Sequence, residues 1–115
     1  MGSVVFLNGI YDIACAICIF SYPEAPLATL HSNMFYGGDG TLQPQCQRLC
    51  AHVCALNGII RLHSIYSTNT RRIIAASYWI EAFVWCMELF RYETVHPYPA
   101  SMTIALGLFL GVLCF

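Results

Sequence analysis

Residues 73–90 read IIAASYWIEAFVWCMELF, an apolar run whose only charged residues are Glu81 and Glu88. Apolar and polar residues do not alternate along it, so a helix is favoured over a strand of a membrane barrel. Its length lies near the lower limit of the roughly 17–25 residues that cross a bilayer core, and a turn of flanking residues can extend it. The run therefore predicts a membrane-spanning helix.

Three further apolar runs cover residues 4–20, 49–66 and 100–115. The first is interrupted by Asn8 and Asp12, and the last carries no charge. Each is long enough to cross a membrane by the same argument. We therefore predict an all-α integral membrane protein, a single domain over residues 1–115 with four transmembrane helices.

One long connection, residues 21–47, joins the first two predicted helices. Pro23 and Pro26 end the first helix, because proline lacks the backbone donor that a continuing helix needs. Apolar residues then recur at helical spacing: Leu27, Leu30, His31, Met34 and Phe35. This pattern predicts a short amphipathic helix on the membrane surface, or otherwise an irregular loop packed on its neighbours. Pro44 is suited to open the second spanning helix.

The composition excludes several classes of protein. Of the 115 residues 58% are apolar and 10% are charged, whereas a soluble domain carries about 25% charged residues. The net charge is −1 and there is no lysine, so no basic face exists for DNA or RNA. We expect lipids and other integral membrane proteins as partners, and no nucleic acid. Catalytic and phosphate-binding motifs are also missing, so we do not expect an enzyme.

Four ionisable residues fall inside the predicted spans: Asp12, Arg61, Glu81 and Glu88. A charge at the bilayer centre costs roughly 2.5–3.5 kcal/mol on the insertion scale, so such groups face protein and find partners. Arg61 is the one cation deep in this set, with Asp12 and Glu81 as its candidate counter-ions. We expect a structural ion pair; the alternative is a proton path or a polar ligand site between helices.

His52 and His63 are eleven residues apart on one predicted helix, so they share a face at different depths. Each could separately ligate a haem iron or a chlorophyll magnesium, which leaves the cofactor unknown. Cys46, Cys50 and Cys54 also step along one face, but they do not converge on one ion, so we expect packing and no metal site. Gly107 and Gly111 form a small-xxx-small pair on the last helix, where they could face the first helix or a partner protein.

From residue 48 to residue 94 the chain resembles the small four-helix membrane scaffold family of ergosterol biosynthesis. The resemblance is carried by Arg48, Ile60-Arg61, Tyr78-Trp79, Glu88-Leu89-Phe90 and Thr94. It implies a protein that is not a catalyst and tethers sterol C-4 demethylation enzymes at the endoplasmic reticulum. It would also make Arg61 and Glu88 structural positions of the family.

The function we expect first is that of a non-catalytic accessory subunit of a larger membrane complex. A photosystem or a respiratory assembly is a reasonable host, which would place the chain in a thylakoid or mitochondrial inner membrane. The first alternative is the sterol-enzyme scaffold in the endoplasmic reticulum. The second is a small transporter or proton-handling protein that uses Asp12, Arg61 and Glu81.

Overall fold

The computed structural model describes residues 2–22, 24–35, 44–63 and 70–115, and all of its regular elements are helices. In chain order they are α1 (Gly2–Ser21), α2 (Pro26–Ser32), α3 (Pro44–His63), α4 (Arg71–Met87), the π-helix η2 (Glu88–Tyr92) and α5 (Pro97–Cys114). The prediction of an all-α protein is therefore confirmed. The predicted run 49–66 corresponds to α3, which begins earlier, at Pro44; residues 64–66 of that run lie outside the described residues.

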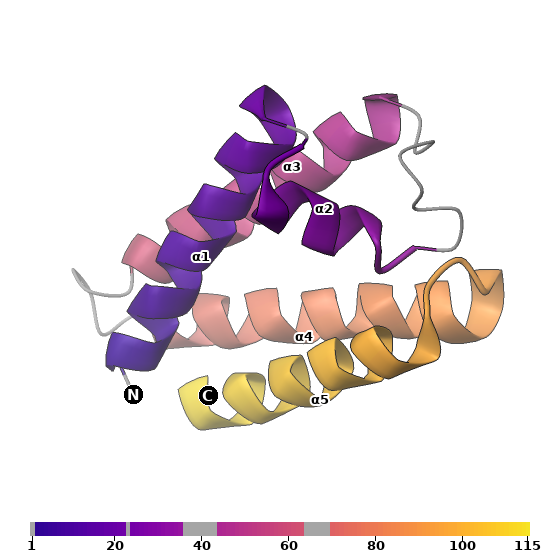
Figure 1. Ribbon diagram of the computed structural model, residues 1–115. Helices are drawn as coiled ribbons and strands as arrows, with labels where there is room; N and C mark the ends of the chain where they lie inside the picture. Colours follow the sequence, from indigo (N-terminus) through magenta and orange to yellow (C-terminus); the bar gives the residue numbers. More distant parts are fainter. Residues whose placement is uncertain (1, 23, 36–43, 64–69) are drawn as a thin grey trace.

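The long helices form two pairs. The most extensive contacts between helices join α1 to α3 and α4 to α5, whereas α3 and α4 touch over a shorter stretch. The α1–α3 pair crosses over the α4–α5 pair (Figure 1), and the molecule measures 41 × 31 × 19 Å. A centrally placed residue of α3 can therefore contact both its own partner helix and the second pair.

Two glycines let α1 and α3 approach closely. A Cβ atom on Gly58 would lie 2.7 Å from Cγ1 of Ile13 and 3.0 Å from the carbonyl oxygen of Gly9. A Cβ atom on Gly9 would lie 3.1 Å from the carbonyl oxygen of Gly58. Small residues that allow close backbone contact are typical of helix interfaces in membranes. The sequence analysis did not single out these two glycines.

Gly107 and Gly111 face α4, which corrects the expectation that they face the first helix or a partner protein. A Cβ atom on Gly107 would lie 3.1 Å from the carbonyl oxygen of Tyr78, and one on Gly111 would lie 2.1 Å from Nε1 of Trp79. The two helices run antiparallel, so the last turn of α5 meets the first half of α4. Gly107 and Gly111 therefore serve a helix contact within the chain.

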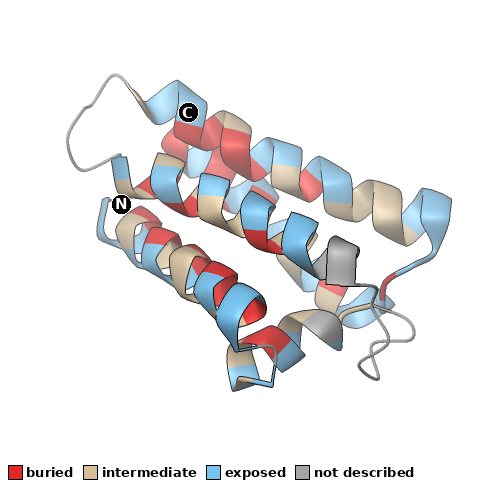
Figure 2. Cartoon of the chain, turned by 90° about the horizontal axis from the view of Figure 1, so that it is seen from above, coloured by how far each residue is buried: buried red, intermediate tan, exposed pale blue. Residues whose placement is uncertain are grey.

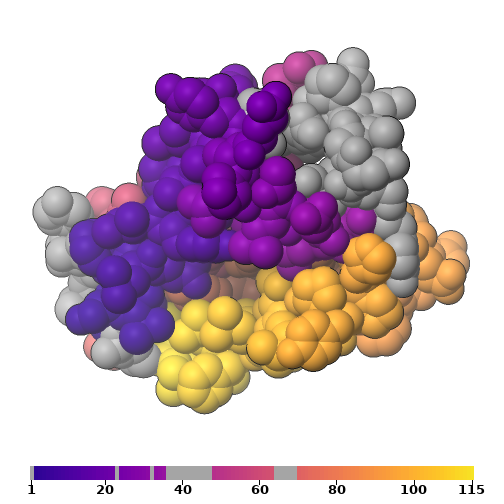
Figure 3. Space-filling model, viewed as in Figure 1, coloured from indigo at the N-terminus to yellow at the C-terminus, as the bar shows by residue number. Residues whose placement is uncertain are grey.

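A short helix, α2, lies in the segment predicted to be amphipathic and ends before Met34 and Phe35; its position on a membrane surface stays a prediction. Ala28 of α2 is buried against Ile19 and Ala51, which attaches the helix to the α1–α3 pair. Beyond α2, the backbone N–H of His96 donates to the carbonyl oxygen of Met34 at 2.8 Å, and Phe35 pairs with Val95 in an isolated bridge. These bonds hold the segment after α2 beside the start of α5 (Figure 3).

Three helical stretches are long and apolar enough to cross a membrane by length and composition: Gly2–Ser21, Arg71–Tyr92 and Pro97–Cys114. The helix α3 has 20 residues but is not among them, since it includes Arg48, His52, Asn57 and Arg61. A possible multi-pass membrane protein is thus supported, and four spans are not confirmed. The buried residues concentrate where helices face one another, while the outward faces are largely exposed (Figure 2).

Candidate functional site

A charge cluster lies where the two helix pairs cross. Arg61 of α3 is only 1% exposed. Its Nη1 donates a hydrogen bond to Oδ2 of Asp12 on α1 at 2.5 Å, and its Nη2 donates to Oε2 of Glu81 on α4. One guanidinium group therefore joins three helices through charge-assisted hydrogen bonds, which are about twice as strong as neutral ones.

Two further side chains complete this cluster. Nδ2 of Asn8 donates to Oδ2 of Asp12 at 3.2 Å, so the same carboxylate oxygen accepts from both Asn8 and Arg61. The Tyr78 ring, 2% exposed, lies against the guanidinium with Cζ of Arg61 3.9 Å from the ring centroid. A cation over an aromatic face at this distance is attracted by the ring's negative face, and the ring also covers the cation.

Two buried polar atoms of the cluster are left over. Within the described part of the chain, Nε of Arg61 and the hydroxyl oxygen of Tyr78 have no hydrogen-bond partner. A buried polar atom normally has a partner, because leaving it unpaired costs about 1–3 kcal/mol. Both atoms belong to the residues that stack on one another, so the unused hydrogen-bonding capacity is concentrated at this one place.

Helical spacing explains why these residues meet. Asn8 and Asp12 are four residues apart on α1, so their side chains share a face. Arg61 lies three residues after Gly58 on α3, and Asp12 lies three residues after Gly9 on α1. Because α1 and α3 run antiparallel, Arg61 and Asp12 lie within one turn of these glycines in opposite directions, and the close approach of the two helices there leaves the side chains within hydrogen-bonding distance.

Glu88 lies apart from the cluster, at the end of α4. Its carboxylate accepts a hydrogen bond from the Thr94 hydroxyl, and its backbone carbonyl accepts from the Thr94 N–H at 3.1 Å. The helix continues beyond Glu88 as the π-helix η2, and it ends at Glu93, which has a left-handed φ of 54°. Glu88 therefore fixes the end of the helix.

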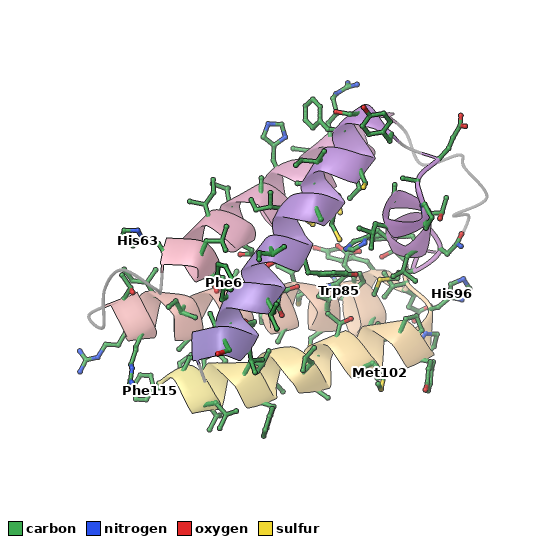
Figure 4. All side chains as sticks on the ribbon, turned by 60° about the vertical axis from the view of Figure 1, so that its left-hand side comes forward. Phe6, His63, Trp85, His96, Met102 and Phe115 are labelled. Carbon is green, nitrogen blue, oxygen red and sulfur yellow. The ribbon has the colours of Figure 1, made fainter. Side chains whose placement is uncertain are left out.

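The two histidines occupy exposed positions on α3. Nδ1 of His52 lies 2.7 Å from the carbonyl oxygen of Arg48, to which it donates a hydrogen bond. The Phe20 ring meets the His52 ring edge-on with 5.7 Å between centroids. His63 lies at the outer end of the helix (Figure 4). Ligation of a haem or chlorophyll by either residue stays a prediction.

The cysteines lie mostly at helix contacts. Cys15 is buried, and Cys18 and Cys50 pack against the cluster of Ile19, Ala28 and Ala51. The side chain of Cys46 lies outside the described residues. Among the residues that are described, no group of three or more His, Cys, Asp or Glu side chains is arranged to hold a metal ion.

The sequence pointed to Asp12, Arg61 and Glu81, and the structure brings these three together. The sequence analysis did not identify Asn8, Tyr78, Gly9 or Gly58 as parts of this site. The spacing of Asn8 from Asp12 and of Tyr78 from Glu81 was the available signal, since residues three or four apart share a helix face.

Comparison with known proteins gives no relative: no family model matches the chain, and no curated protein and no solved structure is significantly similar to it. The resemblance to the ergosterol scaffold family therefore stays a prediction. Two of the residues that carry it, Glu88 and Thr94, bond to one another at the end of α4.

Proposed function

We propose that this chain is a non-catalytic accessory subunit of a larger multi-protein membrane complex. The proposal rests on one observation: only a small fraction of the residues of each candidate span is buried within the chain. In the most apolar 18-residue windows, 33% is buried for α1, 28% for α4 with η2, and 28% for α5. Most of this apolar surface must be covered by something outside the chain, because water cannot solvate it favourably.

The proposal includes α3 as a fourth span. The helix packs along the length of α1, and its buried arginine is neutralised within the bundle, which removes much of the cost of insertion. Figures 1 and 2 both draw the two chain ends close together at one end of the bundle. An even number of crossings is the arrangement that leaves both ends on one side of a membrane.

Large aromatic residues on the outward faces favour protein partners in addition to lipid. Phe83 of α4 is 65% exposed, and Phe109 of α5 is 60% exposed. Aromatic side chains are enriched in the buried centres of protein interfaces, where they supply large contact areas. Met102, which is also exposed, points away from the other helices (Figure 4).

The test is purification of the tagged chain from its native membranes in a mild detergent, followed by quantitative mass spectrometry. An accessory subunit is recovered with a fixed set of membrane proteins in constant ratio to itself. Recovery with sterol-biosynthesis enzymes would instead support the scaffold function at the endoplasmic reticulum. Recovery of the chain with lipid alone would overturn both proposals.

A second candidate function, a small transporter or proton-handling protein, is favoured by the Asp12–Arg61–Glu81 cluster. Proton flux across vesicles that contain the purified chain tests it. Flux that disappears in Glu81→Gln would support this function, and vesicles as tight as protein-free ones would contradict it.

A further inference from the structure

The charge cluster contains more acid than base. One guanidinium pairs with two carboxyl groups, so the fully ionised cluster has one negative charge in excess. Its members have little access to water: the exposed side-chain fraction is 1% for Arg61, 10% for Asp12 and 25% for Glu81. An uncompensated charge in such a place costs several kcal/mol, because the surroundings replace little of the lost hydration.

Among the described residues, Arg61 is the only cation that bonds to Asp12 or Glu81. Arg71 of α4 is a further cation in this neighbourhood, where it acts on Cys114 of α5. Other titratable groups that approach the cluster are the phenols of Tyr11 and Tyr78 and the thiols of Cys15, Cys54 and Cys114. Phenols and thiols are neutral when protonated and negative when not, so none of them can balance a carboxylate. His31 of α2 contacts the Tyr11 ring, with centroids 6.3 Å apart, rather than the carboxyl groups.

We propose that the Asp12–Glu81 pair binds one proton in the resting protein. The cluster is then neutral and consists of the Arg61 cation, one carboxylate and one carboxylic acid. The proton comes from water and forms an O–H bond on a carboxyl oxygen; no group is oxidised or reduced. The partly exposed Glu81 gives the proton a route of exchange, and the two carboxyl groups share it because Arg61 holds them together.

Two buried atoms of the cluster without a hydrogen-bond partner among the described residues indicate that the site holds a further hydrogen-bonding group besides its three ionic groups. The hydroxyl of Tyr78 and Nε of Arg61 are buried, polar and unpaired within the described residues. A carboxylic acid both donates and accepts, and a water beside it would do the same. Such a water could accept from Nε of Arg61 and bond to the Tyr78 hydroxyl.

The proposal makes an unusual prediction for single substitutions. Asp12→Asn leaves Arg61 with Glu81, and Glu81→Gln leaves it with Asp12; either pair is already neutral without a proton. Each substitution alone should therefore abolish the bound proton. If local burial instead caused protonation, only the substitution of that one carboxyl group would remove it.

Infrared spectroscopy of the full chain in lipid bilayers tests this directly, because a protonated carboxyl group has a C=O band that shifts in D2O. At neutral pH the folded wild type should show this band, and both single variants should lack it. Glu88→Gln is the matched control, since Glu88 bonds to Thr94 outside the cluster, and this variant should keep the band. Circular dichroism checks that each variant is folded.

A folded wild type without the band would overturn the proposal, and this result needs no variant. Loss of the band in only one of the two single variants would overturn the sharing of the proton. The proposal depends on the membrane location but not on the accessory role. A chain that purifies without partners and still shows the band would therefore refute the proposed function alone.

Discussion

Arg61 is the residue on which the packing of the two helix pairs depends. It is buried, it bonds to one carboxylate on α1 and one on α4, and it stacks on Tyr78. A buried ion pair is not by itself a large source of stability, since both charges lose their hydration. Removing one partner, however, leaves the other charges buried without compensation, and this is costly.

We expect Arg61→Ala to lower the free energy of unfolding by about 3–5 kcal/mol, because two carboxyl groups lose their shared cation. The measurement is reversible unfolding in detergent micelles, followed by circular dichroism. Arg91→Ala is the control, because Arg91 is exposed in η2 and should change stability by less than about 0.5 kcal/mol. Equal stability of the two variants would show that the cluster does not hold the helices together.

At the scale of single residues, the sequence predicted the charged residues of the site but not the neutral residues that contact them. Asp12, Arg61 and Glu81 could be predicted because a charge in an apolar run must find a partner. For Tyr78 the three-residue spacing from Glu81 was a signal but not a sufficient one, since an aromatic residue in such a run fits lipid, a helix interface or a cation equally well. The π-helix that follows α4 from Glu88 has no clear signal in the sequence, so the contact of Glu88 with Thr94 could not be predicted.

At the scale of the helices, close approach at small residues sets the geometry of the charge cluster. The α1–α3 contact depends on Gly9 and Gly58, and the α4–α5 contact depends on Gly107 and Gly111. The pair on α5 could be recognised from its four-residue spacing in one helix. The glycines of α1 and α3 stand alone in separate runs, so only the packed structure reveals that they face one another.

We expect Gly58→Val to destabilise the folded chain by about 1–3 kcal/mol, because the new side chain overlaps Ile13 and the α1 backbone. The same unfolding experiment measures the effect. Gly2→Val is the matched control, since a Cβ atom on Gly2 would meet nothing within 4 Å. A Gly58→Val protein as stable as this control would mean that α1 and α3 do not approach closely at that position.

The apolar runs predicted three helices well and the fourth less well. Three of the predicted runs match helices of the structure almost completely: 4–20 matches α1, 73–90 matches α4 with η2, and 100–115 matches α5. Hydropathy identifies such helices well because most of their residues are apolar. The helix α3 also contains residues before the apolar run, Pro44 to Arg48, and its polar residues lower its hydropathy. The proposal that α3 is a span therefore rests on its packing rather than on its composition.

At the scale of the whole molecule, the number of crossings is the first property to test. Four spans require both chain ends on one side of the membrane, whereas the three most apolar spans alone would separate them. We predict that reporter tags fused before Met1 and after Phe115 are accessible from the same side, since the two ends lie close together in the fold. Accessibility from opposite sides would exclude α3 as a span.

The scarcity of charge and the thin, open bundle have one common consequence for the whole molecule. Three of the eleven acidic and basic residues, Asp12, Arg61 and Glu81, pair inside the bundle, and most of each candidate span is exposed. Such a surface is suited to contacts with lipid and with other membrane proteins. Whether protein or lipid covers it decides the function.

Native mass spectrometry of the chain, released from its own membranes in a mild detergent, is the most direct test of the accessory role. We predict one dominant assembly that contains this chain and other membrane proteins in fixed stoichiometry, and that loses this chain only in harsher detergent. A dominant species with the mass of the single chain plus bound lipid would contradict the account.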